Sequence, residues 1–278
     1  TDALAKENVE YETICLMNYD AVPEDTACLV INAPSSDFSE DDKNKVISYL
    51  EAGGKVITNT LYNGENMTNY YAILEYMGIT VEDGSVLEGD SSYYYQIPFY
   101  LLPEVKTNSY TTNISNNYYI FAPYAQGMQL DGEDESLSFT EILTTSAHAY
   151  VKSDVSNAAD YRKTENDVEG TFVIGVEAVK TYEDSETEAT LVAYSCSELF
   201  TDAASQVVSG ANQMLFTNTI SKFVDHTVSV SIPVKSYEVS TLTVAQSDRI
   251  LISAMTTVIM PMVCLLIGFV IWFKRRRR

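Results

Sequence analysis

Short apolar runs alternate with helical periods between positions 11 and 77. The runs ETICLM (12–17) and CLVIN (28–32) are typical of strands buried on both faces. Ser39 precedes three acidic residues and predicts a helix N-terminus, because the first turn of a helix favours negative charge. That helix is expected to end at Gly53–Gly54, and KVITNT (55–60) predicts a third strand. A strand, a helix and a strand joined by short loops predict parallel strands with a right-handed crossover.

The rest of the chain divides into a helix, a polar middle segment and a second strand-rich part. We expect a helix at 67–77. The middle segment, 90–161, is rich in Tyr, Asn, Ser and Thr, and we interpret it as a β-rich insertion of short strands and loops. Apolar runs at 170–179 and 189–194 predict strands, and a long helix is expected over 204–223.

The C-terminal end of the chain carries the most specific signal. Ile250–Phe273 is an unbroken stretch of 24 residues without a charge. As a helix it would extend roughly 36 Å, which is enough to cross a hydrocarbon core of about 30 Å. Lys274–Arg278 follows directly, and a cluster of cations beside a span stays on the cytoplasmic side. The sequence therefore predicts one transmembrane helix, a basic cytoplasmic tail (274–278) and an extracytoplasmic domain before the helix.

The charge balance narrows the class of partner. The formal net charge is −22, and about −27 remains outside the membrane once the five cations of the tail are excluded. Such a surface repels nucleic acid and anionic lipid, so nucleic-acid binding is excluded. With 46% hydrophobic residues the chain can still build a core. We expect one α/β domain over 1–230 and a juxtamembrane stalk at 231–249, where polar and apolar residues alternate.

The cysteines indicate no disulfide framework. Cys264 lies in the expected span, which leaves Cys15, Cys28 and Cys196 outside the membrane. An odd number of thiols cannot all pair, and the first two fall in apolar runs where a small buried thiol is ordinary. The chain also begins at Thr1 without a Met or an apolar leader. We expect the native chain to begin further upstream, with a signal peptide or a first transmembrane helix.

Several phrases occur in an order that resembles the extracytoplasmic component of gliding-motility-type ABC transporters, the GldG-like family. They are CLVINAPSSDFSEDDKNKVISYLEAGGKVI, FAPYAQGMQL followed by ILTTSAHAY, LVAYSCSELF, GANQMLFTNTI, and IPVKSYEVSTLTV before PMVCLLIGFVIWFKRRRR. Together they cover the chain almost from end to end. The family commonly has a Gly-Asp-Ser-like turn after the late strand, whereas this chain has Tyr194-Ser195-Cys196-Ser197.

The resemblance carries expectations about fold and partners. It implies a flavodoxin-like or class I glutamine amidotransferase-like α/β fold with a mostly parallel sheet, in agreement with the strand-helix-strand pattern. It also implies a membrane permease and a cytoplasmic ATPase as separate chains in a bacterial cell membrane. A further transmembrane helix and the first strand of the sheet are expected upstream of Thr1.

Polar loops after the predicted strands are the candidate ligand site. Open α/β sheets bind ligands at the carboxyl ends of their strands, which here indicates Asn32, Ser35, Ser36 and Asn59. Through the resemblance, Ser195 and Ser197 of the turn after the late strand join this set. The same residue types also form ordinary turns. No cofactor or metal is expected, since the chain has two histidines, neither a Walker A motif nor GxGxxG, and an acidic loop at 131–135 that fails the EF-hand spacing.

Two catalytic or adhesive alternatives stand beside the accessory-subunit interpretation. An amidotransferase-like hydrolase would use Cys196 as nucleophile and His148 as base, although its elbow lacks the glycines that form an oxyanion hole. A glycan-binding or adhesion module would use the tyrosines between 93 and 124. The sequence favours a non-enzymatic accessory subunit of an ABC transport system, which binds a partner or substrate outside the membrane and packs on the permease through its helix.

Overall fold

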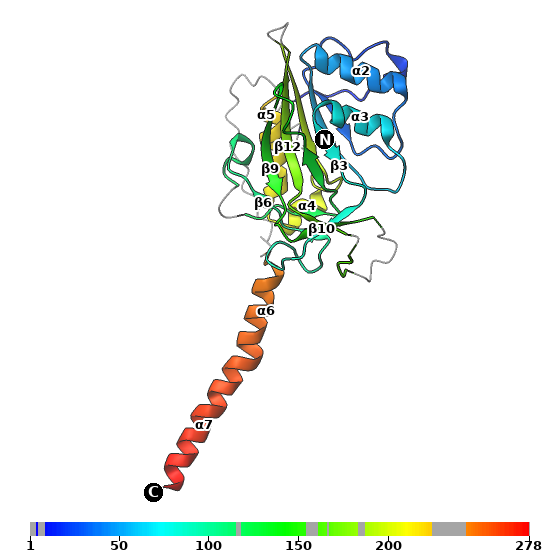
Figure 1. Cartoon of the computed structure of the whole chain (residues 1–278). Coiled ribbons are helices and arrows are strands. Elements are labelled where there is room, and N and C mark those ends of the chain that lie inside the picture. The colour runs from blue at the N-terminus through cyan, green and yellow to red at the C-terminus, as the bar shows by residue number, and fades with distance from the viewer. Residues whose placement is uncertain are drawn as a thin grey trace.

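A computed structural model describes residues 4, 9–114, 118–153, 161–165, 167–182, 187–223 and 243–277. A central sheet is covered on one face by α2 and α3 and on the other by α4 and α5, and a long helix leaves one end of the domain (Figure 1). Adjacent residues of the central strands pack into opposite cores. Val56 packs on the side of α2 and α3, and Ile57 packs on the side of α4 and α5. Burial of both strand faces accounts for the continuous apolar runs.

The main sheet is mixed. Three neighbouring strands at one edge are parallel, and the other five pairings are antiparallel. The path runs β1 (Leu29–Asn32), β2 (Lys55–Asn59), β13 (Glu188–Tyr194), β12 (Val173–Thr181), β8 (Met128–Leu130) and β3 (Ile79–Val81), with β9 (Leu137–Thr144) also pairing β12, and β6 (Glu104–Val105) pairing β9.

The expectation of a mostly parallel sheet is therefore wrong beyond β1, β2 and β13. Strands β12 and β13 follow each other with only a short connection, and a short connection can join antiparallel strands but not parallel ones. Strands β8 and β9 also reach β12 in the antiparallel sense.

The segment 90–161 is not a separate insertion. It supplies β6, β8 and β9 to the main sheet, and β9 pairs β12 along most of its length. The rest of the segment forms peripheral structure, which consists of η2 (Ser109–Thr111), the pair β5 (Tyr100–Leu101) and β7 (Ala122–Pro123), and β10 (Ala149–Lys152). Strand β10 forms a small sheet with β11 (Val168–Gly170) and β4 (Ser85–Leu87), which both lie outside the segment. The polar composition of this segment gave no clear pattern of buried strands, because β9 buries only its last residues.

The first predicted helix is confirmed as α2 (Glu40–Glu51). Ser39 caps it, with Oγ accepting from the backbone N–H of Asp42 at 3.0 Å. Gly53 follows with φ +88°, a left-handed conformation that favours glycine. The second helix, α3 (Thr68–Tyr76), is also confirmed and ends before Gly78 at φ +71°.

Two elements differ from the prediction. The run 12–17 forms no strand and leads into a 3₁₀ turn, η1 (Leu16–Asn18). Ile14, just before this turn, and Leu16 within it pack against the core beside α2. The helix expected over 204–223 is two helices, α4 (Asp202–Val207) and α5 (Ala211–Ser221). Ser209 and Gly210 between them both have positive φ, of 54° and 92°, which a helix cannot contain.

The C-terminal helix runs from Gln246 to Arg276 through α6 (Gln246–Ala254), a π-helical turn η3 (Met255–Ile259) and α7 (Met260–Arg276). It is long and apolar enough to cross a membrane, and none of its apolar window is buried in the domain. Residues 226 and 231–242 of the expected stalk region lie outside the described residues. Helix begins at Gln246, so the last part of the expected stalk 231–249 is helical.

Candidate functional site at the carboxyl end of the sheet

The ends of β1, β2 and β13 place two of the predicted site residues in contact. Asn32 pairs with Asn59 in register, and Asn59 pairs with Tyr194. The side-chain Nδ2 of Asn59 donates to Oδ1 of Asn32 at 2.9 Å. Asn32 is exposed and Asn59 is buried, so the side chain of Asn32 faces solvent and is held in place by the buried amide of Asn59. Parallel strands bring these residues together because their carboxyl ends share one edge of the sheet.

A buried tyrosine from α3 supports the pair. Tyr70 donates its hydroxyl proton to the carbonyl of Asn59 at 2.9 Å, so Thr58 Oγ1, 2.6 Å away, donates to Tyr70. Burial raises the pKa of Tyr70 above its ordinary range, and the phenol stays neutral. Sequence reasoning missed Tyr70, since a tyrosine in an apolar helical stripe carries no local sign of a polar contact.

Asp37 orders the loop that carries Ser35 and Ser36. Its Oδ1 accepts from the backbone N–H of Tyr70 at 2.9 Å, and its Oδ2 accepts from the backbone N–H and the Nδ2 of Asn69 at 3.0 and 3.2 Å. These N–H groups belong to the first turn of α3, where a carboxylate is favourable. Ser35 and Ser36 are exposed beside this loop, next to the two asparagines in chain order.

The two serines after β13 have different surroundings. Ser195 is fully buried, its hydroxyl donates to the carbonyl of Ile174 at 3.3 Å, and its own carbonyl accepts from Gln126 N at 2.8 Å. Ser197 is half-buried in the following turn. The segment around Gln126 thus covers this part of the sheet edge. Asn32, Ser35 and Ser36 form the accessible part of the predicted site, and Asn59 lies buried against Asn32.

Cys196 has the surroundings of a structural thiol. It is fully buried, and its Sγ lies 3.1 Å from the carbonyl of Pro123, to which it donates. Burial raises its pKa to about 12, so the thiolate needed for nucleophilic attack is not formed near neutral pH. No hydrogen bond joins Cys196 to His148 in the part of the chain that the structure describes.

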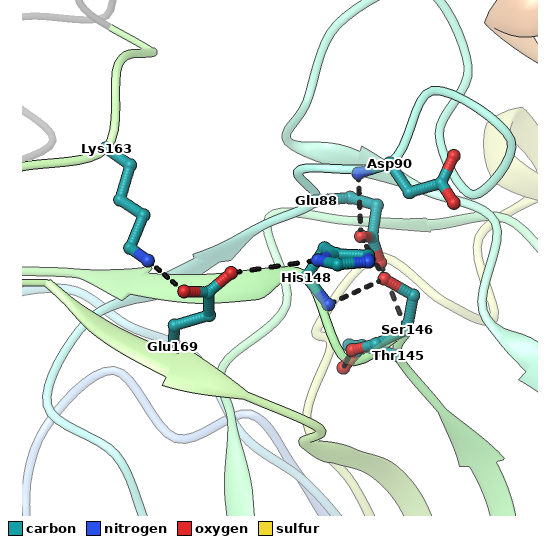
Figure 2. Close-up of polar contacts among 7 residues, drawn as sticks. All are labelled: Glu88, Asp90, Thr145, Ser146, His148, Lys163 and Glu169. Carbon is teal, nitrogen blue, oxygen red and sulfur yellow. Dashed lines mark hydrogen bonds and ion pairs between the residues drawn. The ribbon is translucent and has the colours of Figure 1, made fainter.

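A second polar cluster closes the turn between β9 and β10 (Figure 2). Glu88, which is 2% exposed, accepts through Oε1 from Ser146 Oγ at 2.6 Å and Asp90 N at 3.1 Å, and through Oε2 from Ser146 N at 3.2 Å. Burial raises its pKa. This carboxyl group ties the segment after β4 to the turn that follows β9.

His148 belongs to the surface side of this turn. Its side chain is 70% exposed, and its Nδ1 lies 3.8 Å from Oε1 of Glu169, which also contacts Lys163 (Figure 2). The contact with Lys163 lowers the pKa of Glu169. Ser146 Oγ accepts from the backbone N–H of His148, and among the described residues no hydrogen bond joins it to the imidazole. Ser146 and His148 therefore do not form a nucleophile and base pair.

The accessible chemistry is hydrogen bonding by neutral amides and hydroxyls. Within the described ranges, no group of three His, Cys, Asp or Glu residues is arranged to hold a metal ion. The carboxylate of Asp37, in the loop after β1, is occupied by the N–H groups of α3. Such a surface suits recognition of a polar ligand or a protein segment.

Comparison with known proteins supports the fold alone. No protein-family model and no curated protein matches the chain. Among solved structures, the chain resembles the mmIFT52 N-terminal domain, with a TM-score of 0.52, 12% identity, and coverage of 73% of this chain and 80% of that one. A ThuA-like protein from Bacteroides uniformis ATCC 8492 matches with a TM-score of 0.35 and 12% identity over 71% and 69% of the two chains. The domain thus has the α/β architecture of the mmIFT52 N-terminal domain, joined to a C-terminal helix long and apolar enough to cross a membrane.

Proposed function

We propose that this chain is a membrane-anchored accessory subunit of an ABC transport system. Its α/β domain binds a partner protein or substrate outside the bacterial cell membrane, and its C-terminal helix packs against the permease. The observation that carries the proposal is the helix Gln246–Arg276, whose apolar window is wholly exposed and which ends in cations. The partner class, a permease with a cytoplasmic ATPase, comes from the resemblance to GldG-like proteins.

The exposure of this helix supports a membrane position. A core helix of a soluble protein would be buried, and a signal sequence would lie near the N-terminus, whereas this helix is unburied and C-terminal. An apolar cylinder of this size in water costs on the order of tens of kcal/mol, because each large apolar side chain contributes about 1.5–3 kcal/mol. Lipid or the helices of a partner must therefore cover it.

The basic end supports an outward position of the domain. Lys274, Arg275 and Arg276 occupy the last turn of α7. Arg276 lies over the ring of Trp272 at 5.2 Å, and Arg277 over that of Phe273 at 4.9 Å. Aromatic rings gather at both interfaces of a span, and Lys and Arg are enriched on its cytoplasmic side. The acidic domain at the other end of the helix then lies outside.

Binding is favoured over catalysis by the state of the reactive groups. The thiol of Cys196 is buried and protonated, and the carboxyl group of Glu88 is occupied by three donors. The exposed loops after β1 and β2 offer neutral hydrogen-bonding groups, with Asn32, Ser35 and Ser36 as the accessible ones.

Co-purification tests the proposal. The full chain, isolated from native membranes in a mild detergent, should retain a multi-span permease and an ATPase with a Walker motif. The matched control keeps the domain and the tail but replaces 250–273 with a polyleucine span of the same length, and it should lose the permease. Recovery of the natural chain as a stable monomer without either subunit would remove the proposal.

A further inference from the structure

The first turn of the C-terminal helix is docked on the domain. The backbone N–H of Gln246 donates to the carbonyl of Tyr94 at 3.2 Å, and that of Ser247 donates to the carbonyl of Ser91 at 3.0 Å. Ala245, just before the helix, is 2% exposed and belongs to the core under α4 and α5. Free N–H groups at a helix start need acceptors, and here the loop 90–95 provides them. The helix therefore leaves the domain in a defined direction.

This docking places the loop close to the membrane. Ile250, the first residue of the uncharged stretch, lies three positions after Ser247, which corresponds to about 5 Å along a helix axis. The polar headgroup layer on each side of a bilayer is roughly 5–8 Å thick. A loop bonded to Ser247 thus lies at the depth of the headgroups. Figure 1 shows α4 and β10 at this same end of the domain, where α6 begins.

An aromatic platform adjoins the docked loop. Tyr95 N donates to the carbonyl of Tyr100 at 2.8 Å, and the ring of Tyr100 lies 5.7 Å from that of Tyr124. Phe99 packs against Tyr124 at 5.8 Å. Tyr124 is 48% exposed although it is held at φ 53°, a strained conformation for a tyrosine. Tyrosine is enriched at membrane interfaces because its ring is apolar and its hydroxyl polar.

The charge around the platform selects the headgroup. Asp90 belongs to the docked loop, where its Oδ1 accepts from the backbone N–H of Ser92 at 2.8 Å, and Glu198 is exposed in the turn after β13. Acidic groups beside aromatic rings attract an ammonium ion and repel a phosphate that has no compensating cation. A zwitterionic lipid carries its ammonium group outermost, whereas phosphatidylglycerol exposes only negative charge.

We propose that the surface around the exposed Tyr124, to which the half-buried Tyr95 and Tyr100 contribute, rests on the headgroup layer of the outer leaflet and contacts the ammonium groups of zwitterionic lipids. This inference rests on the membrane anchoring in the proposed function and not on the identity of the transport partner.

Quenching of a single tryptophan tests the contact. The chain has one tryptophan, Trp272, so a Trp272→Phe background accepts a reporter at a chosen site. The full chain is placed in phosphatidylcholine nanodiscs that contain lipid with a nitroxide on the headgroup. Tyr124→Trp is the reporter. Tyr182→Trp is the control, because the seven residues of β13 separate its end of the sheet from the end that carries Tyr124 by roughly 20 Å. At least twofold stronger quenching is expected at position 124.

The outcomes separate the two proposals. Quenching of Trp272 in the natural chain shows insertion of the helix, and its absence would overturn the anchoring itself. If Trp272 is quenched but positions 124 and 182 show equal, weak quenching, the lipid contact of the surface around Tyr124 is overturned and the anchoring is not. This outcome includes the case in which protein covers that surface. Nanodiscs of phosphatidylglycerol should reduce the quenching at position 124, and an increase would overturn the preference for ammonium headgroups.

A second measurement guards against a misfolded reporter. Hydrogen exchange of the natural chain should be slower at 90–102 in phosphatidylcholine nanodiscs than in detergent micelles, because the headgroup layer excludes water from that loop. The edge of the sheet near Tyr182 should exchange alike in both. Identical exchange of 90–102 in the two environments would contradict the inference.

Discussion

At the scale of single residues, a few buried polar side chains determine how the loops of this domain connect. Glu88 bonds to Ser146, 58 positions away, and Asp37 bonds to the start of α3, 32 and 33 positions away. Asn212 is fully buried and bridges the backbone of Phe121 and Leu199. Buried donors and acceptors without partners are costly, so each of these side chains holds several segments at once.

Replacing Glu88 by Ala should lower the free energy of unfolding by about 3 kcal/mol, because three donors then lose their acceptor in a buried site. Chemical unfolding of the full chain in detergent measures this. Glu104→Ala is the control, since Glu104 only pairs with Lys106 on the surface and should change stability by less than about 1 kcal/mol. Equal losses of unfolding free energy in both variants would contradict the role assigned to the hydrogen bonds of Glu88.

The same residue predicts a pH dependence. Burial raises the pKa of Glu88 above its ordinary 4.5, so the folded protein binds this proton more tightly than the unfolded chain. Its contribution to stability is present at low pH and is lost as the pH rises through the folded pKa. Natural protein should therefore gain stability relative to Glu88→Gln as the pH falls from neutral toward the ordinary pKa of 4.5. Unfolding midpoints of the two proteins across this range check it, and parallel curves would count against it.

At the scale of elements, local signals worked where the backbone itself carries the information. The cap Ser39 and the left-handed Gly53 bound α2 as expected. Signals of the same kind were overlooked at Ser209-Gly210, where the left-handed backbone divides α4 from α5. Pro261 explains the π-helical turn before it, because a proline lacks the N–H of the regular helix and clashes with the carbonyl four residues earlier.

Gly210 should resist substitution for a purely conformational reason. A Cβ at this position meets no atom within 4 Å, so the cost of Gly210→Ala comes from φ +92° alone, about 1–2 kcal/mol. Gly170 also has open space but no positive φ, and Gly170→Ala should change stability by less than about 0.5 kcal/mol. Thermal unfolding of the two variants compares them directly, and similar shifts would contradict the role assigned to the positive φ of Gly210.

The start of α3 is capped by Asp37, which lies in a loop 32 and 33 positions earlier in the chain. Asp37→Ala leaves the N–H groups of Asn69 and Tyr70 without their acceptor and should cost about 1–2 kcal/mol. Asp41→Ala removes a surface pair with Lys45 and should cost about 0.5 kcal/mol or less. Hydrogen exchange at the start of α3 should rise in the first variant only.

At the scale of the whole molecule, the chain joins an acidic domain to a basic tail through one apolar helix. Thiol labelling tests the orientation. Cys15 is exposed in the domain, whereas Cys28 and Cys196 each have a pKa raised to about 12 by burial and should not react at pH 7. A membrane-impermeant maleimide on intact cells should label the natural chain, and Cys15→Ser should abolish this.

The tail provides the complementary probe. In a Cys15→Ser background, Arg277→Cys should react only after the cells are opened, because the proposed orientation places the basic tail in the cytoplasm. Labelling of position 277 on intact cells, with Cys15 protected in the natural chain, would reverse the orientation and remove the outward position of the domain.

The sequence by itself determined the features that arise within a short stretch of chain. These are the uncharged span and its cations, the acidic balance, the crossover of β1, α2 and β2, and the positions of Asn32 and Asn59 at neighbouring strand ends. Chain length, charge and backbone preference act locally, so a linear pattern contains them. The mmIFT52 domain likeness is consistent with this α/β core and extends no further than the fold.

Only the tertiary structure decided which strands the polar middle segment contributes and how the domain meets its helix. The pairing of β9 with β12, the bonds of Glu88, Asp37 and Asn212, and the docking of Gln246 on Tyr94 all join residues distant in the chain. Such contacts depend on the free energy of the assembled core, in which a polar group gains its partner only after both segments have packed. A linear sequence does not display that pairing, because every serine, aspartate and tyrosine in it has many equally plausible local roles.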